Sequence, residues 1–199
     1  MRFVPLSVTV LFFSAAAFAG QIREFDFRTI ERLGSELARV SQTADRGATT
    51  PARKRAKETA IAALRHELFK THYEYVVLDD PTGHGFLVYA LVSVPNKIAL
   101  CGHFRVTVSG DGEKAERVDA LSHGLLFAPG PPSGLPGKKP VIVSVSQAVS
   151  NKPLETSVYT SLHDVVLVSV GMLDGTVWGI VMGQIFQMDS KGNAVRRGW

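Results

Sequence analysis

Two hydrophobic patterns divide the chain near His72. Before this residue, apolar side chains recur every three or four positions, the spacing that places them on one face of an α-helix. The first such segment runs from Phe27 to Ser41, and the second runs from Ala52 to Lys70. The apolar stripes consist of Ile30, Leu33, Leu37 and Val40 in the first segment and Ala60, Ile61, Leu64 and Leu68 in the second. A polar stretch joins the two segments, which predicts a helical hairpin.

Residues typical of helix starts precede both segments. Asp26 stands before the first one, and its carboxylate can accept a hydrogen bond from a free backbone N–H of the first turn. Thr49 or Thr50 can do the same for the second helix, where Pro51 suits the first helical position.

After His72 the apolar positions alternate with a period of two, and β-branched and aromatic residues become frequent. This pattern predicts β-strands. The segments are YEYVVL, FLVYALVSV, IALCGHFRVTV, PVIVSVSQAV, TSVYTSLHDVVLVSV and TVWGIVMGQIFQM. Turn pairs such as Asp111-Gly112 separate some of them, and no segment reads as a crossover helix. We therefore expect mainly antiparallel pairing.

These elements predict an α+β fold. An N-terminal helical hairpin, within a helical part spanning residues 24–72, would pack on a β-rich part spanning residues 73–190. We expect about eight strands in a curved, mainly antiparallel sheet or a sandwich. The strand around Tyr89 is apolar on both sides, with Val88 and Ala90 on one side and Leu87 and Leu91 on the other, which predicts cover on both faces.

The first 19 residues read as a secretory signal peptide. Arg2 supplies a positive charge, an apolar run follows, and Ala17 and Ala19 provide the small residues that signal peptidase requires. We expect cleavage near Ala19, a single mature domain over residues 20–199, and a periplasmic or secreted location. No later stretch is apolar over a membrane-spanning length, so we expect no transmembrane segment after signal removal.

The charge is unevenly distributed. The chain holds 22 basic and 18 acidic residues, and the excess of basic residues lies in the N-terminal part. Arg53, Lys54, Arg55 and Lys57 form a cluster that fits a protein or an anionic envelope polymer. The alternative is a solvated helix start without a partner. We expect no nucleic acid partner, because the predicted export removes the chain from nucleic acid and no nucleic-acid motif accompanies the charge.

The single cysteine, Cys101, lies close to His103 and Arg105. Strict alternation would place these three side chains on one face of a strand, about 6.5–7 Å apart in succession. That spacing is too long for a direct bond between the thiol and the imidazole. A thiol enzyme would need a base from another strand, and a metal site would need a further ligand. The alternative is a buried, inert thiol.

Other motifs are incomplete. The stretch from Arg65 to His72 resembles a zinc-protease helix only in part, because Lys70 occupies the position of the second histidine. No serine-nucleophile or phosphate-loop motif occurs. We therefore expect no cofactor and no metal, and the balance of these observations is against an enzyme.

The sequence thus predicts an exported, non-enzymatic binding protein whose partner is unknown. The basic cluster and the proline-rich stretch over residues 128–140 are the candidate contact surfaces. Two alternatives remain. One is a thiol-dependent enzyme or metal-binding protein that uses Cys101, His103 and Arg105. The other is a carrier of a small apolar ligand in a pocket between the helices and the sheet.

Overall fold

The computed structural model describes residues 22–130, 141–189 and 191–195. The predicted signal peptide and most of the proline-rich stretch lie outside the described residues. Among the described helices, none has the length and apolar character needed to cross a membrane.

The described residues form three helices and eleven strands, in an α+β arrangement. The helices are α1 (Phe27–Val40), α2 (Pro51–Ala63) and α3 (Glu155–His163). The first sheet has the spatial order β1 (Tyr73–Asp79), β2 (Gly85–Val92), β4 (Phe104–Ser109) and β5 (Ala115–Ala120). The second has the order β11 (Ala194–Val195), β10 (Gln184–Met188), β9 (Val177–Val181), β8 (Leu167–Met172) and β7 (Ile142–Gln147). A small third sheet pairs β3 (Lys97–Ala99) with β6 (Phe127–Pro129).

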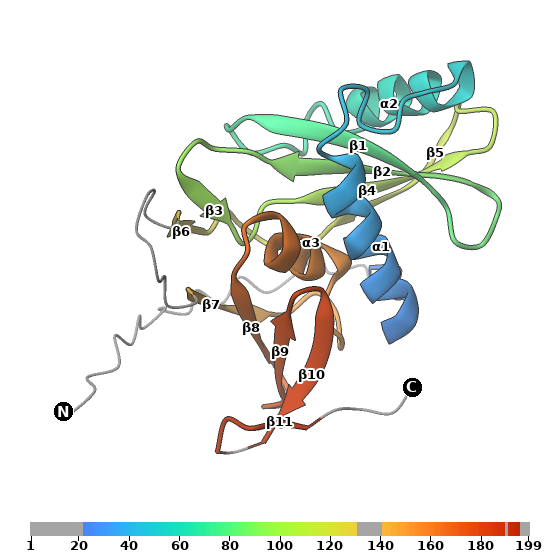
Figure 1. Ribbon diagram of the computed structural model, residues 1–199. Coiled ribbons are helices and arrows are strands. Elements are labelled where there is room, and N and C mark those ends of the chain that lie inside the picture. The colour runs from blue at the N-terminus through green and yellow to red at the C-terminus, as the bar shows by residue number, and fades with distance from the viewer. Residues whose placement is uncertain (1–21, 131–140, 190, 196–199) are drawn as a thin grey trace.

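The elements stack in layers (Figure 1). Helix α2 covers the outer face of the first sheet, while α1 and α3 lie between the first sheet and the second. Strand β2 is consequently buried on both faces. Val88 and Ala90 belong to the core under α2, whereas Leu87 and Tyr89 belong to the core around α1 and α3. This confirms the cover expected from the two-sided apolar pattern of that strand.

Local signals place α1 and the start of α2 correctly. The Asp26 carboxylate accepts the Thr29 N–H at 2.9 Å, and the predicted stripe of α1 is buried along its whole length. Thr50 caps α2 by accepting the Arg53 N–H, and Pro51 is its first residue. The second helix nevertheless ends at Ala63, well before the expected Lys70, because the chain turns there toward β1.

The structure does not confirm the helical hairpin. Helix α1 packs chiefly on α3, and α2 packs on the opposite face of the first sheet. It does not confirm the sandwich either, since helices lie between the two larger sheets. Helices α1 and α2, although adjacent in sequence, therefore pack in different hydrophobic cores.

The stretch from Thr156 to Val170 was expected to be a strand, and this prediction is wrong for its first half. That half belongs to α3, which connects β7 to β8 as a crossover, so these two strands pair in parallel. Alternating β-branched residues favour a strand locally, but packing against α1 decides the outcome. At the helix crossing, a Cβ added to Gly34 would lie 2.4 Å from the Val158 Cβ, so only glycine permits this approach.

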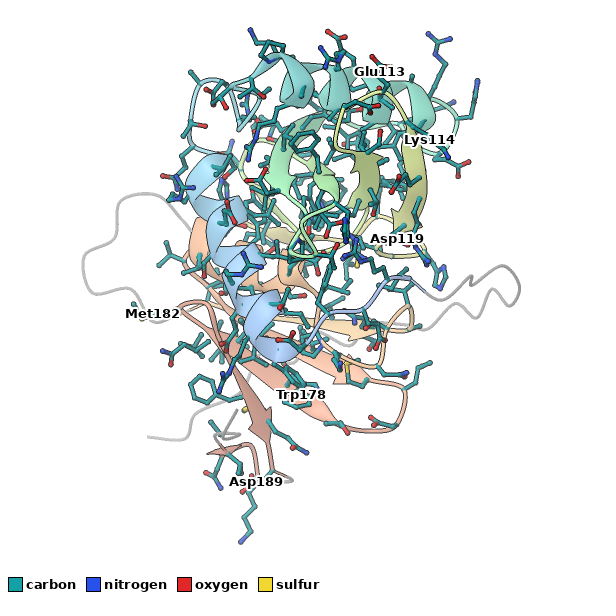
Figure 2. The ribbon with its side chains drawn as sticks, turned by 90° about the vertical axis from the view of Figure 1, so that its right-hand side faces the viewer. Glu113, Lys114, Asp119, Trp178, Met182 and Asp189 are labelled. Atoms are coloured by element: carbon teal, nitrogen blue, oxygen red, sulfur yellow. The ribbon has the colours of Figure 1, made fainter. Side chains whose placement is uncertain are left out.

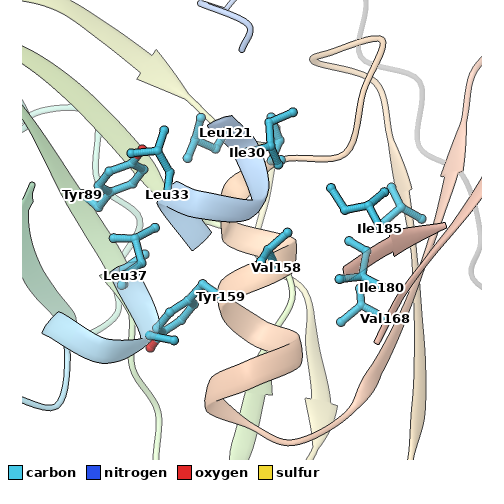
Figure 3. Packing of buried hydrophobic residues seen from close by; sticks show 14 of the residues in the cluster. Ile30, Leu33, Leu37, Tyr89, Leu121, Val158, Tyr159, Val168, Ile180 and Ile185 are labelled. Carbon is cyan, nitrogen blue, oxygen red and sulfur yellow. The ribbon is translucent and has the colours of Figure 1, made fainter. Parts of the chain in front are cut away.

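The larger core centres on α1 and α3. Figure 3 shows Val158 and Tyr159 of α3 between Leu33 and Leu37 of α1 on one side and residues of the second sheet on the other. The second sheet contributes Val168, Ile180 and Ile185. One continuous core thus links the two sheets through the helical layer.

Candidate functional site

The Cys101–Arg105 segment does not form one strand. Strand β4 begins only at Phe104, and Gly102 has a φ of 97°, a left-handed conformation that L side chains rarely adopt. This turn breaks the alternation on which the shared face of Cys101, His103 and Arg105 depended. Each of the three side chains has different surroundings.

His103 is a buried structural residue. Its Nδ1 accepts the Val92 N–H at 3.0 Å, which assigns the ring proton to Nε2, 3.4 Å from the Ala99 carbonyl oxygen. Burial lowers its pKa to about 4, so the imidazole is neutral near pH 7. In this arrangement both ring nitrogens are already engaged, and the ring joins the end of β2 to the end of β3.

Cys101 lines a pocket but is poorly suited to nucleophilic chemistry. Burial raises its pKa to about 11, and a hydrogen bond with Ser122 offsets only part of this rise. The thiol is therefore protonated near pH 7, whereas reactive cysteines lie in surroundings that lower the thiol pKa.

Arg105 is completely buried within an ionic network. Its Nη1 donates to the Glu155 Oε1 at 2.5 Å, and its Nη2 donates to the Asp119 Oδ2 at 2.7 Å. Burial opposes the positive charge, but the two carboxylates outweigh it and raise the arginine pKa. The Tyr89 hydroxyl donates to the same oxygen of Glu155 at 2.9 Å. Figure 2 shows Asp119 at the level where the upper and lower parts of the molecule meet.

The same network holds the N-terminal segment of the described chain. Arg105 Nη2 also donates to the Arg23 carbonyl oxygen at 2.5 Å, and its guanidinium lies 4.8 Å from the centre of the Phe25 ring. The Arg23 side chain binds Asp80 at 2.5 Å, and Glu24 accepts the Asn151 N–H. These contacts join both halves of the fold, which assigns Arg105 a structural role.

A pocket of about 310 Å³ lies where the second sheet approaches the chain segment before β6. Residues 145–149 form one wall, and residues 121–126 form another. Cys101, Leu154 and Leu173 add to the lining, which is predominantly apolar. Leu173 at the rim is 80% exposed, an unusual state for a leucine next to an apolar pocket.

A smaller pocket of about 100 Å³ has a polar lining that includes Glu74, His163 and Asp164. The hydrogen bond with Asp164, 3.1 Å away, raises the pKa of His163. The described residues contain no group of three or more His, Cys, Asp or Glu side chains placed to hold a metal ion.

The predicted basic cluster is partly engaged in the fold. Arg53 pairs with Asp79 at 2.5 Å and donates to the Gly47 carbonyl oxygen, and its side chain is only 19% exposed. Arg55 donates to the Asp111 carbonyl oxygen at 3.0 Å and so ties α2 to the turn before β5. Lys54 is exposed and Lys57 half-buried. Lys54 is thus the member most available to a partner.

Sequence reasoning did not identify Glu155, Asp119 or the apolar pocket. Glu155 lies just outside the predicted strands and is the first residue of a helix that the sequence did not indicate. Asp119 lies in a polar edge strand that the apolar alternation did not detect. The pocket combines segments far apart in the chain, so no local pattern indicates it. The proximity of Glu155 to the buried Arg105 becomes visible only when the fold is known.

No known family model matches the chain, and comparisons with curated proteins and with solved structures found no significant similarity.

Proposed function

We propose that this protein is a non-enzymatic binding protein that receives an apolar group of a protein partner in the pocket beside Cys101. In this proposal it acts in the periplasm or outside the cell, after cleavage near Ala19. The observation that carries the proposal is the pocket itself, with its apolar lining and the exposed Leu173 at its rim.

The size of the pocket favours a small apolar group. Its volume of about 310 Å³ is at the lower end of the range of about 300–1,000 Å³ found for ligand pockets. A space of this size accommodates one or two aliphatic or aromatic side chains. A partner protein that presents such side chains fits better than a ligand with a long acyl chain.

The carrier of a small apolar ligand is the second candidate, and the same apolar lining favours it. It differs from the first in what would occupy the pocket after gentle purification. Native mass spectrometry distinguishes the two, because a carrier would retain a small molecule.

The thiol enzyme is less favoured. The protonated Cys101 thiol and the engaged ring of His103 supply neither a ready nucleophile nor a free base. The basic cluster, with Lys54 as its most exposed member, remains a proposed secondary contact for an acidic partner or an envelope polymer.

Photocrosslinking in producing cells tests the proposal. A photoreactive amino acid at Leu173 samples the pocket rim, and the same group at Lys54 samples the basic cluster. We expect a protein adduct from Leu173 that disappears when Gly124→Trp fills the pocket. The Cβ added at Gly124 meets no atom within 4 Å, so the larger side chain has room to be accommodated.

Ser144→Trp serves as the matched control, because Ser144 is exposed but does not line the pocket. Adducts from Lys54 alone would show that the partner contacts the basic cluster and would refute a role for the pocket. A copurifying small molecule without a protein adduct would identify a carrier instead.

A further inference from the structure

Strand β7 is the open edge of the second sheet. It pairs with β8 on one side, and no described strand pairs with its other side. Natural proteins usually protect such edges with charges, prolines or short lengths, because an unpaired strand edge readily binds another strand. The residues of β7, Ile142–Gln147, include neither a charged residue nor a proline.

The hydrogen-bond register identifies the free groups on this edge. Leu167 pairs with Ile142, and the Leu167 N–H donates to the Val141 carbonyl oxygen. In a parallel ladder, the backbone groups of every second residue then face β8 and those of the residues between face away. The N–H and C=O groups of Ser144 and Ser146 therefore face outward. No described residue forms a hydrogen bond with them.

The apolar pocket reaches this edge at the carboxyl end of β7. Val145, Ser146 and Gln147 of β7 all contribute to its lining. Successive side chains of a strand point to opposite faces, so a pocket lined by all three extends past the edge or the end of the strand. Residues 121–126 also line this pocket, so it joins the end of the β7 edge to the chain segment before β6.

We propose that an extended peptide segment of a partner adds to β7 as a new strand and inserts an aliphatic or aromatic side chain into the pocket. The chemistry of the site identifies this occupant. The outward backbone groups can pair with the N–H and C=O groups of an extended chain, and the apolar pocket beside Ser146 suits an apolar side chain on that chain. This inference rests on the proposed function, since it names the kind of partner that the pocket receives.

A second copy of this chain is the competing occupant, because two β7 strands could pair across a twofold axis. The apolar pocket that reaches this edge favours a peptide with an apolar side chain instead, because pairing of two β7 edges uses only backbone groups. The test therefore includes the oligomeric state.

The test uses fluorescein-labelled, blocked hexapeptides in which one central position carries Val, Leu, Ile, Met or Phe in turn. Ser146→Pro removes one outward N–H and spares the ladder with β8, and proline is tolerated on strand edges. We expect the best peptide to bind the full mature protein and to bind Ser146→Pro at least tenfold more weakly. Methylation of the central backbone nitrogen of that peptide should weaken binding to a similar extent. Ser146→Ala is the matched control and should change binding less than twofold.

The dye anilinonaphthalene sulfonate reports separately on the pocket. It should bind Ser146→Pro as it binds the unchanged protein, and it should fail to bind Gly124→Trp. Equal peptide affinity for Ser146→Pro and the unchanged protein would overturn strand addition but leave the pocket proposal standing. If Gly124→Trp binds both the peptide and the dye as well as the unchanged protein does, the pocket proposal itself is refuted.

Two other results would overturn the inference. One is the absence of binding by every peptide in the set. The other is a dimer, detected by analytical ultracentrifugation, that dissociates in Ser146→Pro, because it would assign the edge to a second copy.

Discussion

At the scale of single residues, the neutral state of His103 has a measurable consequence. Its Nδ1 must remain unprotonated to accept the Val92 N–H, and burial lowers its pKa from the usual value near 6.5 to about 4. Below about pH 6.5 the unfolded chain binds a proton that the folded chain does not, so folding stability falls as the pH decreases toward 4. The shift corresponds to about 3 kcal/mol, at roughly 1.4 kcal/mol per pKa unit.

We therefore predict that His103→Gln weakens the pH dependence of stability between pH 6.5 and 4. The glutamine amide can retain both an acceptor and a donor but does not titrate. Urea unfolding across this range measures the effect, and His84→Gln at an exposed position is the control. An identical slope in His103→Gln and the unchanged protein would contradict the prediction.

The thiol of Cys101 provides a second prediction at this scale. With a pKa of about 11, the native thiol holds far less thiolate at pH 8 than an ordinary cysteine with a pKa of about 8.5. We expect native labelling by iodoacetamide to be about a hundredfold slower than labelling of the denatured chain. Fast native labelling with a lowered apparent pKa would instead support the thiol-enzyme alternative.

At the scale of elements, the crossing of α1 and α3 depends on Gly34. Alanine is a better helix former than glycine by about 1 kcal/mol, so local propensity alone predicts that Gly34→Ala stabilises α1. The added Cβ would, however, lie 2.4 Å from the Val158 Cβ and 2.6 Å from the Glu155 carbonyl oxygen. Overpacking typically costs about 1–3 kcal/mol, and the backbone oxygen leaves little room for relief.

We therefore predict that Gly34→Ala lowers the free energy of unfolding by about 1 kcal/mol or more, even after the gain in propensity. Thermal and urea unfolding measure it. Ser35→Ala on the exposed side of α1 is the matched control and should be neutral or slightly stabilising. A stabilised Gly34→Ala protein would show that the crossing is looser than described.

At the scale of the whole molecule, the buried pair of Arg105 and Glu155 joins the first sheet to the crossover helix of the second. Both side chains are almost completely buried and 2.5 Å apart. Removal of one partner from a buried ion pair leaves an uncompensated charge and commonly costs about 3–5 kcal/mol. Asp119 still pairs with Arg105 in Glu155→Gln, so we predict a loss of up to about 3 kcal/mol, measured by urea unfolding.

The pair of Glu36 and Arg39 supplies the control for this prediction. Its atoms are 4.0 Å apart and the arginine side chain is 71% exposed, so Glu36→Gln should change stability by no more than about 1 kcal/mol. Similar small effects of both substitutions would mean that the buried network contributes little to the union of the two sheets.

The local elements were predictable from sequence to different extents. The first helix has a regular stripe and an aspartate cap, so periodicity and capping identify its bounds almost to the residue. The strand containing Tyr89 was recognisable, including its burial on both faces, because both sets of alternate positions are apolar. The third helix was missed, since its alternating Thr156, Val158 and Thr160 fit a strand equally well.

The candidate site was less predictable. Cys101 was identified as a residue of interest and does line the pocket, but its supposed partnership with His103 and Arg105 depended on strand alternation, which the left-handed Gly102 interrupts. Glu155 completes the surroundings of Arg105 from a position 50 residues away in sequence. A contact between residues so far apart in the chain produces no periodic pattern in the sequence.

The sequence by itself determined the α+β class, the first helix, the start of the second and the two-sided burial of β2. These properties depend on interactions within a few residues and on the apolar pattern of single segments. Only the tertiary structure decided the helical state of α3, the parallel pairing of β7 with β8, the ionic network around Arg105, and the pocket beside the open edge. The physical reason is that each of these depends on contacts between segments far apart in the chain, and burial and close packing there outweigh local preference.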